Sequence, residues 1–296
     1  MQVQDTSFLK NEIMRLKKEK DVVILAHNYE IPDVQDVADF TGDSLGLSRL
    51  AATVPQKTIL FCGVHFMAET ASIISPEKRV LLPSLEAGCS LSDSITVEEL
   101  RNWKKQHPNA ISVGYVNTTA EIKSELDYCC TSSNAVNVVK AIPEDKEILF
   151  LPDMFLGSYV AKMTGRKNMH IWAGECHVHA GITPEDVTKK LQSMKDAEFV
   201  IHPECSCTTP MMYDVADGSY DDKKVSILST EGMLNHVSKS NSKNFVVATE
   251  TGILYRMKKE KVPNGFYKNG KPKFKSVTIQ DKTQPKYKKK VILQGD

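Results

Sequence analysis

The stretch from residue 22 to residue 44, VVILAHNYEIPDVQDVADFTGDS, decides the fold, because the chain repeats its pattern twice more. An apolar run is followed by polar residues, then by a segment of helical spacing, and then by a hydroxyl-bearing loop. The second copy begins at Ile111 and the third at Phe199, and each copy continues to a second apolar run, at 59–61, 148–150 and 245–247. A fixed period of this kind indicates the architecture. We therefore predict three equivalent units around a shared axis.

Each unit alternates short β-branched runs with segments of helical periodicity. The runs at 22–25, 57–61 and 80–82 are separated by helical spacing such as that of Val34 and Val37. This alternation predicts parallel βαβ units with right-handed crossovers. The fold class is therefore α/β, with three pseudo-threefold-related domains whose small parallel sheets surround a central site. The predicted boundaries are 1–88, 89–175 and 176–255, followed by a basic tail at 256–296.

Composition limits the class of protein. The 296 residues are 41% hydrophobic and 25% charged, as in an ordinary globular protein. No apolar run approaches the ~20 residues of a membrane span, and the N-terminus lacks the apolar core of a signal peptide. We expect a cytoplasmic protein with no membrane or nucleic-acid partner. Seven cysteines, an odd number, favour thiol or metal chemistry over a disulfide framework.

Polar triplets directly follow the first apolar run of every copy. They are HNY at 27–29, YVN at 115–117 and HPE at 202–204. Ligands of parallel sheets bind outside the carboxyl ends of the strands. We therefore expect the three triplets to meet at one site.

Hydroxyl side chains precede a helical run in each copy, at Ser44, Ser132 and Thr230. Such a hydroxyl can cap a helix, and a helix N-terminus offers free N–H groups and a positive dipole end to an anion. Each residue alone reads as an ordinary N-cap. Three at equivalent positions favour a shared pocket for an anionic ligand.

Two cysteines, Cys89 and Cys176, lie 87 residues apart in glycine-bearing loops. Their matched positions predict metal ligands from separate domains. Cys62, Cys129 and Cys130 lie in or beside apolar stretches, and we interpret them as small buried hydrophobes. An alternative is a zinc site formed by the CHVH run at 176–179 together with Cys205 and Cys207, although a Cys-x-x-Cys spacing is missing there.

In these motifs the chain resembles the quinolinate synthase family. The resemblance is carried by LAHNY at 25–29, GDS at 42–44, YVNT at 115–118, CTSSNA at 130–135, IHPEC at 201–205 and ATETG at 248–252. It runs from about residue 10 to about residue 260. It implies a fold of three pseudo-threefold-related α/β domains, in agreement with the repeat.

The resemblance also implies a transferase of NAD biosynthesis. Its members condense iminoaspartate with dihydroxyacetone phosphate to quinolinate, losing phosphate and two waters. They use a [4Fe–4S] cluster held by one cysteine from each domain, with one open iron that acts as a Lewis acid. L-aspartate oxidase or an aspartate dehydrogenase would be the partner that supplies iminoaspartate.

Applied residue by residue, the resemblance implies a role for each residue of the site. Cys89 and Cys176 would hold the cluster, Tyr29, Tyr115 and Glu204 would perform acid–base catalysis, and His179 would make a neighbouring polar contact. The substrate pocket would comprise His27, Ser44, Tyr115, Asn117, Ser132, His202, Glu204 and Thr230.

The C-terminus departs from the family pattern. The repeat spacing predicts a third cysteine near residues 273–277, but no cysteine follows Cys207. The tail from Arg256 onward holds 13 Lys and Arg against three acids. It is either a basic extension, or part of a variant in which Cys205 or Cys207 replaces the third ligand, or the product of a lost reading frame. An active quinolinate synthase and a cluster-deficient, anion-binding or iron–sulfur-binding homologue therefore both stay open.

Overall fold

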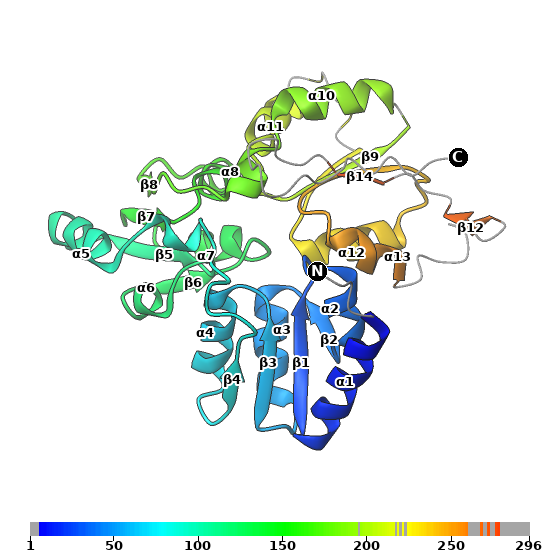
Figure 1. Cartoon of the computed structure of the whole chain (residues 1–296). Coiled ribbons are helices and arrows are strands. Elements are labelled where there is room, and N and C mark those ends of the chain that lie inside the picture. Colours follow the sequence, from blue (N-terminus) through cyan, green and yellow to red (C-terminus); the bar gives the residue numbers. More distant parts are fainter. Residues whose placement is uncertain are drawn as a thin grey trace.

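The computed structural model describes residues 6–259 except 195, 217, 219–220 and 222–223, together with short strands at 267–268, 271–272 and 276–278. Within this part of the chain, three four-stranded parallel sheets form three domains around a common centre (Figure 1). The predicted α/β class and its threefold arrangement are confirmed. No described helix is long and apolar enough to cross a bilayer.

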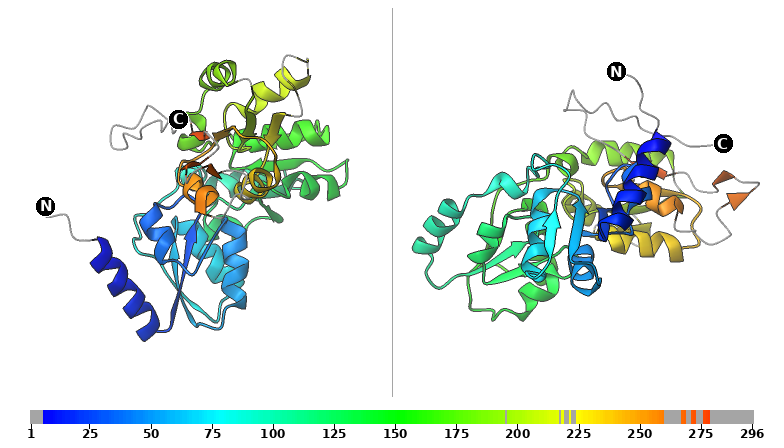
Figure 2. Two further views of the ribbon diagram at one scale, coloured as in Figure 1. Left: turned by 90° about the vertical axis from the view of Figure 1, so that its right-hand side faces the viewer. Right: turned by 60° about the horizontal axis from the view of Figure 1, so that its bottom comes forward.

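The first domain carries the sheet β2-β1-β3-β4. The continuous apolar run of β1 agrees with the burial of five of its six residues, as expected for a central parallel strand that is covered on both faces. Helix α1 lies on the outer side of this domain (Figure 2). The elements are α1 (Thr6–Glu19), β1 (Val22–His27), α2 (Pro32–Val37), β2 (Phe40–Gly42), α3 (Ser44–Thr53), β3 (Thr58–Cys62), α4 (His65–Ile74) and β4 (Arg79–Leu81).

The second domain repeats this order as β6-β5-β7-β8. Its first long helix begins at a capping box, in which Thr96 and Glu99 satisfy each other's backbone N–H groups. The elements are η1 (Ser92–Ser94), α5 (Val97–Gln106), β5 (Ile111–Tyr115), α6 (Ala120–Ser124), β6 (Tyr128–Cys130), α7 (Ala135–Ala141), β7 (Ile148–Leu151), α8 (Met154–Thr164) and β8 (Met169–Ile171).

The third domain has the order β10-β9-β11-β14. Its fourth strand comes from the segment predicted as a tail, where β14 pairs with β11 in parallel. The elements are α9 (His177–Ala180), α10 (Pro184–Ser193), β9 (Glu198–Ile201), α11 (Thr208–Ala216), β10 (Val225–Ile227), α12 (Thr230–Lys239), β11 (Phe245–Ala248), α13 (Ile253–Lys259), the hairpin β12 (Tyr267–Lys268) and β13 (Lys271–Pro272), and β14 (Ser276–Thr278).

Side-chain contacts reproduce the repeat and join the domains. The Asp39 and Asp127 carboxylates accept hydrogen bonds from the backbone N–H groups of Ile24 and Ser112, both at 2.8 Å and both across fifteen residues. A single apolar cluster, which includes Phe61 and Phe150, runs through the first and second domains. This shared cluster therefore fixes the position of the first domain relative to the second. It also fixes the strand ends of both domains that carry site residues.

The first and third domains also meet closely. A Cβ atom at Gly252 would collide with the backbone carbonyl of Tyr29, so only glycine fits there. The Asp36 carboxylate on α2 bonds to Lys10 on α1 and to Tyr255 and Lys259 on α13. The strand end that carries Tyr29 is thereby held against the third domain.

Candidate functional site

The strand ends of all three sheets open onto one cavity of about 420 Å³. Each domain contributes polar side chains to its lining. Every residue that the sequence assigned to the site lines this cavity: His27, Tyr29, Ser44, Cys89, Tyr115, Asn117, Ser132, Cys176, His179, His202, Glu204 and Thr230. The location of these residues thus agrees with their assignment, whereas their individual roles remain predictions.

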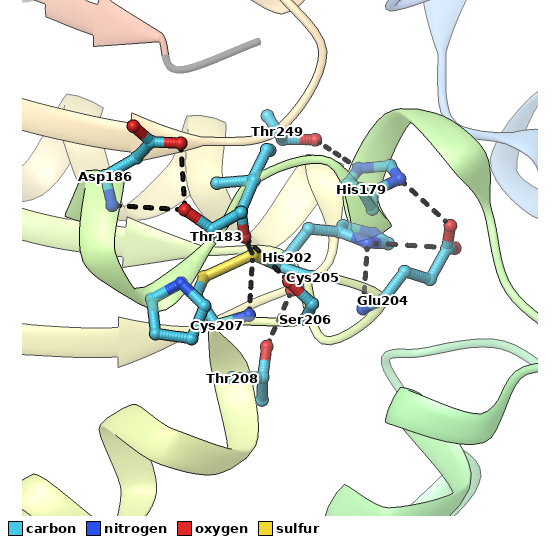
Figure 3. Close-up of a disulfide and its surroundings, with 12 residues drawn as sticks. His179, Thr183, Asp186, His202, Glu204, Cys205, Ser206, Cys207, Thr208 and Thr249 are labelled. Atoms are coloured by element: carbon cyan, nitrogen blue, oxygen red, sulfur yellow. Dashed lines mark hydrogen bonds and ion pairs between the residues drawn. A yellow bond between two sulfur atoms is a disulfide. The ribbon is translucent and has the colours of Figure 1, made fainter. Parts of the chain in front are cut away.

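Glu204 lies at the centre of the polar contacts. The Tyr115 hydroxyl donates to its Oε1 atom, and His179 Nδ1 lies 3.3 Å from its Oε2 atom. His202 Nδ1 is 3.7 Å from Oε1. Figure 3 shows the two imidazoles converging on this carboxylate. All four side chains are buried, and the contacts of Glu204 with Tyr115 and His179 replace the water that its carboxylate has lost.

Thr249 links two site residues and was not predicted. Its Oγ1 atom lies 2.5 Å from the Tyr29 hydroxyl and 2.9 Å from His179 Nε2. Thr249 is fully buried and directly follows β11. Thr249 follows β11 in the third sheet as Gly63 follows β3 in the first. Comparison of the repeats could therefore have identified Thr249 from the sequence. The lining residues Asp43, His177, Ser229 and Glu250 were likewise not predicted as site residues.

The two strand-end histidines share one local geometry. The backbone N–H of Tyr29 donates to His27 Nδ1 at 3.3 Å, and that of Glu204 donates to His202 Nδ1 at 3.4 Å. Both Nδ1 atoms are therefore acceptors, and each neutral ring carries its proton on Nε2. Burial lowers the pKa of both imidazoles to about 4. The site thus holds two neutral N–H donors near neutral pH.

The titratable groups around Glu204 comprise proton donors and the Glu204 carboxylate itself. Burial, with the nearby Glu204 charge, raises the pKa of Tyr29 and of Tyr115 well above the usual value. Burial alone would raise the pKa of Glu204, but His202, His179 and Tyr115 outweigh it and lower the pKa to about 2. Burial alone would lower the pKa of His179, but Cys176 and Glu204 raise it well above 6.5. The ligand-free site therefore contains protonated tyrosines beside an ionised carboxylate.

Stability is expected to fall as the pH drops from 6.5 toward 4.5. The unfolded state binds protons at His27 and His202 below about pH 6.5, whereas the folded state does not until about pH 4. Each histidine therefore removes up to about 3 kcal/mol of stability by pH 4. The contribution of Glu204 is lost only below pH 4.5, and that of His179 is constant below pH 6.5.

Urea unfolding at a series of pH values tests this dependence. His27→Gln and His202→Gln should each flatten the slope between pH 6.5 and 4.5, while His65→Gln, which changes an exposed histidine, should leave it unchanged. Equal slopes in all four proteins would show that the buried imidazoles do not control acid stability.

Helix N-termini also face the cavity, but their caps differ from the prediction. The cap of α3 is Asp43, whose carboxylate accepts from Gly46 N at 2.7 Å, and the cap of α12 is Ser229. Ser44 and Thr230 are the first helical residues, and Ser132 precedes the Asn134 cap of α7 by two positions. The predicted capping role is wrong by one or two residues. The hydroxyls line the cavity without being used as caps.

The thiols of Cys89 and Cys176 both line the cavity and are half-buried. Burial raises the pKa of Cys89 to about 12, and Cys176 Sγ lies 3.2 Å from His179 Nδ1. Such a desolvated thiol ionises when a cation is beside it, as in a metal centre. Cys176, His179 and Glu204 present ligand atoms within 4.8 Å of one another. The donor set therefore fits a metal centre between the domains.

The other cysteines lie outside this centre. Cys205 and Cys207 form a disulfide, are fully buried among apolar residues of the third domain and do not line the cavity. In Figure 3 the disulfide lies on one side of His202 and the Glu204 carboxylate on the other. Neither the zinc alternative nor a third ligand from this pair is supported. Cys62 and Cys130 are buried as predicted, but Cys129 is exposed, because successive residues of the edge strand β6 point to opposite faces and only Cys130 packs into the core.

The spacing after the edge strands gives a second expectation for the position of a third ligand. Cys89 follows the end of β4 by eight residues, and Cys176 follows the end of β8 by five. The same spacing after Thr278, the end of β14, gives residues 283–286. The predicted window of 273–277 overlaps β14 instead, and its residues 273–275 lie outside the described residues, as do residues 283–286. The sequence there is TQPK, without a cysteine.

Comparison with known proteins identifies the family. The model of the quinolinate synthetase A protein family matches residues 11–290, which is nearly the whole chain. The chain belongs to the quinolinate synthetase A family. The match passes residue 260, where the recognisable motifs end, and includes most of the basic segment. The resemblance predicted from the motifs is confirmed.

Quinolinate synthases from several mycobacteria are close relatives. Those of Mycolicibacterium paratuberculosis and Mycobacterium tuberculosis H37Rv are each 54% identical over 248 residues, which cover 84% of this chain and 71% of the relative. The Mycobacterium sp. KMS protein is equally similar, with 74% covered. The family consists of enzymes of NAD biosynthesis and implies a metal cofactor, for which the cavity supplies donors.

One solved structure aligns weakly with this chain. It is the E-1-hydroxy-2-methyl-but-2-enyl-4-diphosphate reductase from Plasmodium falciparum, with a TM-score of 0.40 and 13% identity over 96% of this chain and 90% of that chain. A likeness at this level supports no conclusion about fold or function.

Proposed function

We propose that this quinolinate synthase condenses iminoaspartate with dihydroxyacetone phosphate to form quinolinate, phosphate and two waters in the cavity between its three domains. The proposal rests on the convergence there of two thiols, two neutral imidazoles and three hydroxyl side chains, two of which stand at helix starts. A volume of about 420 Å³ suits small substrates. The proposed location is cytoplasmic.

Cys89 and Cys176 are the residues that would hold a [4Fe–4S] cluster. When bound, a cluster with an open iron supplies a Lewis acid for dehydration. All other groups belong to the chain itself. The Nε2–H groups of His27 and His202 donate to substrate carboxylate oxygens, because both rings are neutral donors.

The helix starts are the proposed anion site. Ser44 and Thr230 stand at the first positions of α3 and α12, where free backbone N–H groups and the positive dipole end attract phosphate or carboxylate. Ser132 lies before α7 at the equivalent place in the second domain. Together they would position the phosphate that leaves and the carboxylates that remain.

Proton transfer is assigned to the tyrosines. Tyr29 and Tyr115 keep their protons in the buried site, so each can donate to a leaving hydroxyl. Glu204 accepts a hydrogen bond from Tyr115 and pairs with His179. These two contacts orient Tyr115 and His179, and Glu204 itself is the carboxylate assigned to acid–base catalysis. An L-aspartate oxidase or aspartate dehydrogenase would supply iminoaspartate.

A second candidate function has a specific observation in its favour. No third thiol lines the cavity in the described part of the chain, and the sequence has no cysteine beyond Cys207. A cluster held by two cysteines would be labile. The unmodified chain would then bind the anionic substrates without converting them to quinolinate.

Binding of dihydroxyacetone phosphate to the unmodified chain tests the anion site under both functions. Ser44→Ala, Ser132→Ala and Thr230→Ala should each weaken binding by about tenfold or more in calorimetry, since a hydrogen bond to a charged group contributes ~1.5–3 kcal/mol. Ser158→Ala on α8 is the matched control, because its hydroxyl bonds only to Met154 O at 2.7 Å among the contacts of the described residues and lies outside the cavity. Unchanged affinity in all three folded variants would remove the hydroxyls from the site.

A further inference from the structure

A second group of metal-ligating side chains lies in the outer part of the second domain. His107 caps the C-terminal end of α5, Glu147 directly precedes β7, and His170 lies within β8. His107 Nδ1 is 2.9 Å and His170 Nε2 is 2.5 Å from the same Glu147 Oε1 atom. None of the three lines the cavity, and Figure 1 shows α5 and β8 directed away from the centre where the domains meet.

The chemistry of this group suits a borderline divalent ion. Two imidazoles and one carboxylate form a common zinc ligand set that leaves a position for water. With Zn–N and Zn–O bonds of about 2.0–2.2 Å, tetrahedral ligand atoms lie roughly 3.4 Å apart. The three ligand atoms here are all within 4.8 Å of one another, and the two measured separations need to open by an ångström or less.

The side chains are accessible and yet held in place. Their exposed fractions are 28% for His107, 36% for Glu147 and 46% for His170, so an ion can enter and the rings can adjust. Trp103 stacks on the His107 ring at 4.0 Å with planes 11° apart, and it meets the edge of His170 at 5.5 Å. The indole thus contacts both imidazoles, much as outer-shell groups orient metal ligands.

Hydrogen bonding alone is the alternative reading of this cluster. Both imidazole N–H groups would then donate to one oxygen atom of Glu147, and no ion would be needed. That arrangement concentrates two donors on a single acceptor atom. Replacing the two protons by one cation would satisfy the same three atoms and would give each ring a direct bond.

We propose that His107, Glu147 and His170 bind one divalent transition-metal ion, with zinc as the best fit, at a site separate from the cavity. The ion would tie the end of α5 to the edge of the sheet formed by β7 and β8. It would stabilise the second domain, and its remaining coordination position would face solvent.

Trp103 provides a local probe of this site. The sequence contains two tryptophans, so Trp172→Phe leaves Trp103 as the single reporter. In the full chain carrying Trp172→Phe, Co²⁺ should quench the Trp103 fluorescence, and added Zn²⁺ should restore it by displacing the cobalt. Zn²⁺ should also raise the melting temperature.

Three single variants in the same background decide the proposal. His107→Gln, His170→Gln and Glu147→Gln should each weaken Co²⁺ binding, measured by the quenching of Trp103, by about tenfold or more, and should reduce the Zn²⁺-dependent rise in melting temperature. His236→Gln is the matched control, because His236 bonds to Glu198 at 2.6 Å and belongs to no three-ligand group in the described residues. Because only the metal-dependent change is compared, altered basal stability does not obscure the result. Absence of quenching, or equal quenching in the His107→Gln, His170→Gln double variant, would overturn the proposal.

Discussion

Replacement of either Cys89 or Cys176 by alanine is expected to abolish the iron–sulfur charge-transfer absorption after anaerobic reconstitution. Both thiols line the same cavity from different domains, and burial raises the pKa of Cys89 to about 12, so that this sulfur ionises when a cation balances its charge. Bound iron should fall by about tenfold or more, because even changes outside the ligand sphere cost 10–100-fold in metal affinity. Iron and sulfide analysis measures this directly.

Cys129→Ala is the control for this result. Cys129 is exposed on an edge strand and does not line the cavity, so its removal should leave iron content unchanged. A full complement of iron and sulfide in Cys89→Ala would show that Cys89 is not a ligand, and the same holds for Cys176→Ala.

The threefold repeat was readable from the sequence because it rests on local patterns. Apolar runs such as the one in β1 are buried on both faces, and the polar residues that follow them reach the sheet edge by geometry alone. The location of His27, Tyr115 and His202 at the site could therefore be predicted from the sequence. Their shifted pKa values could not be predicted, because the burial of these side chains and their closeness to the Glu204 charge exist only once the domains have packed.

The errors have equally specific physical causes. Ser44 and Asp43 are adjacent, and both residue types favour a helix cap, so spacing could not decide which carboxylate or hydroxyl accepts the Gly46 N–H. Cys129 was taken as buried because two adjacent cysteines do not reveal which of them faces the core from the edge strand β6. Thr249 has no chemical signal of its own and becomes important only through contacts with Tyr29 and His179.

The segment after Arg256 is expected to limit activity. The proposed [4Fe–4S] cluster takes one cysteine from each domain, but no cysteine follows Cys207 in the sequence. The unmodified chain should therefore bind substoichiometric iron and form little quinolinate, since two thiolates hold such a cluster poorly.

Quinolinate formation by a chimera tests the central claim most directly. Residues 256–296 are replaced by a C-terminal segment from a family member that carries the third cysteine, and both proteins are reconstituted anaerobically and assayed with iminoaspartate and dihydroxyacetone phosphate. We expect a full cluster and sustained quinolinate formation in the chimera, with little of either in the unmodified chain. A chimera that holds a full cluster without forming quinolinate, or an unmodified chain that matches an active chimera, would contradict this claim.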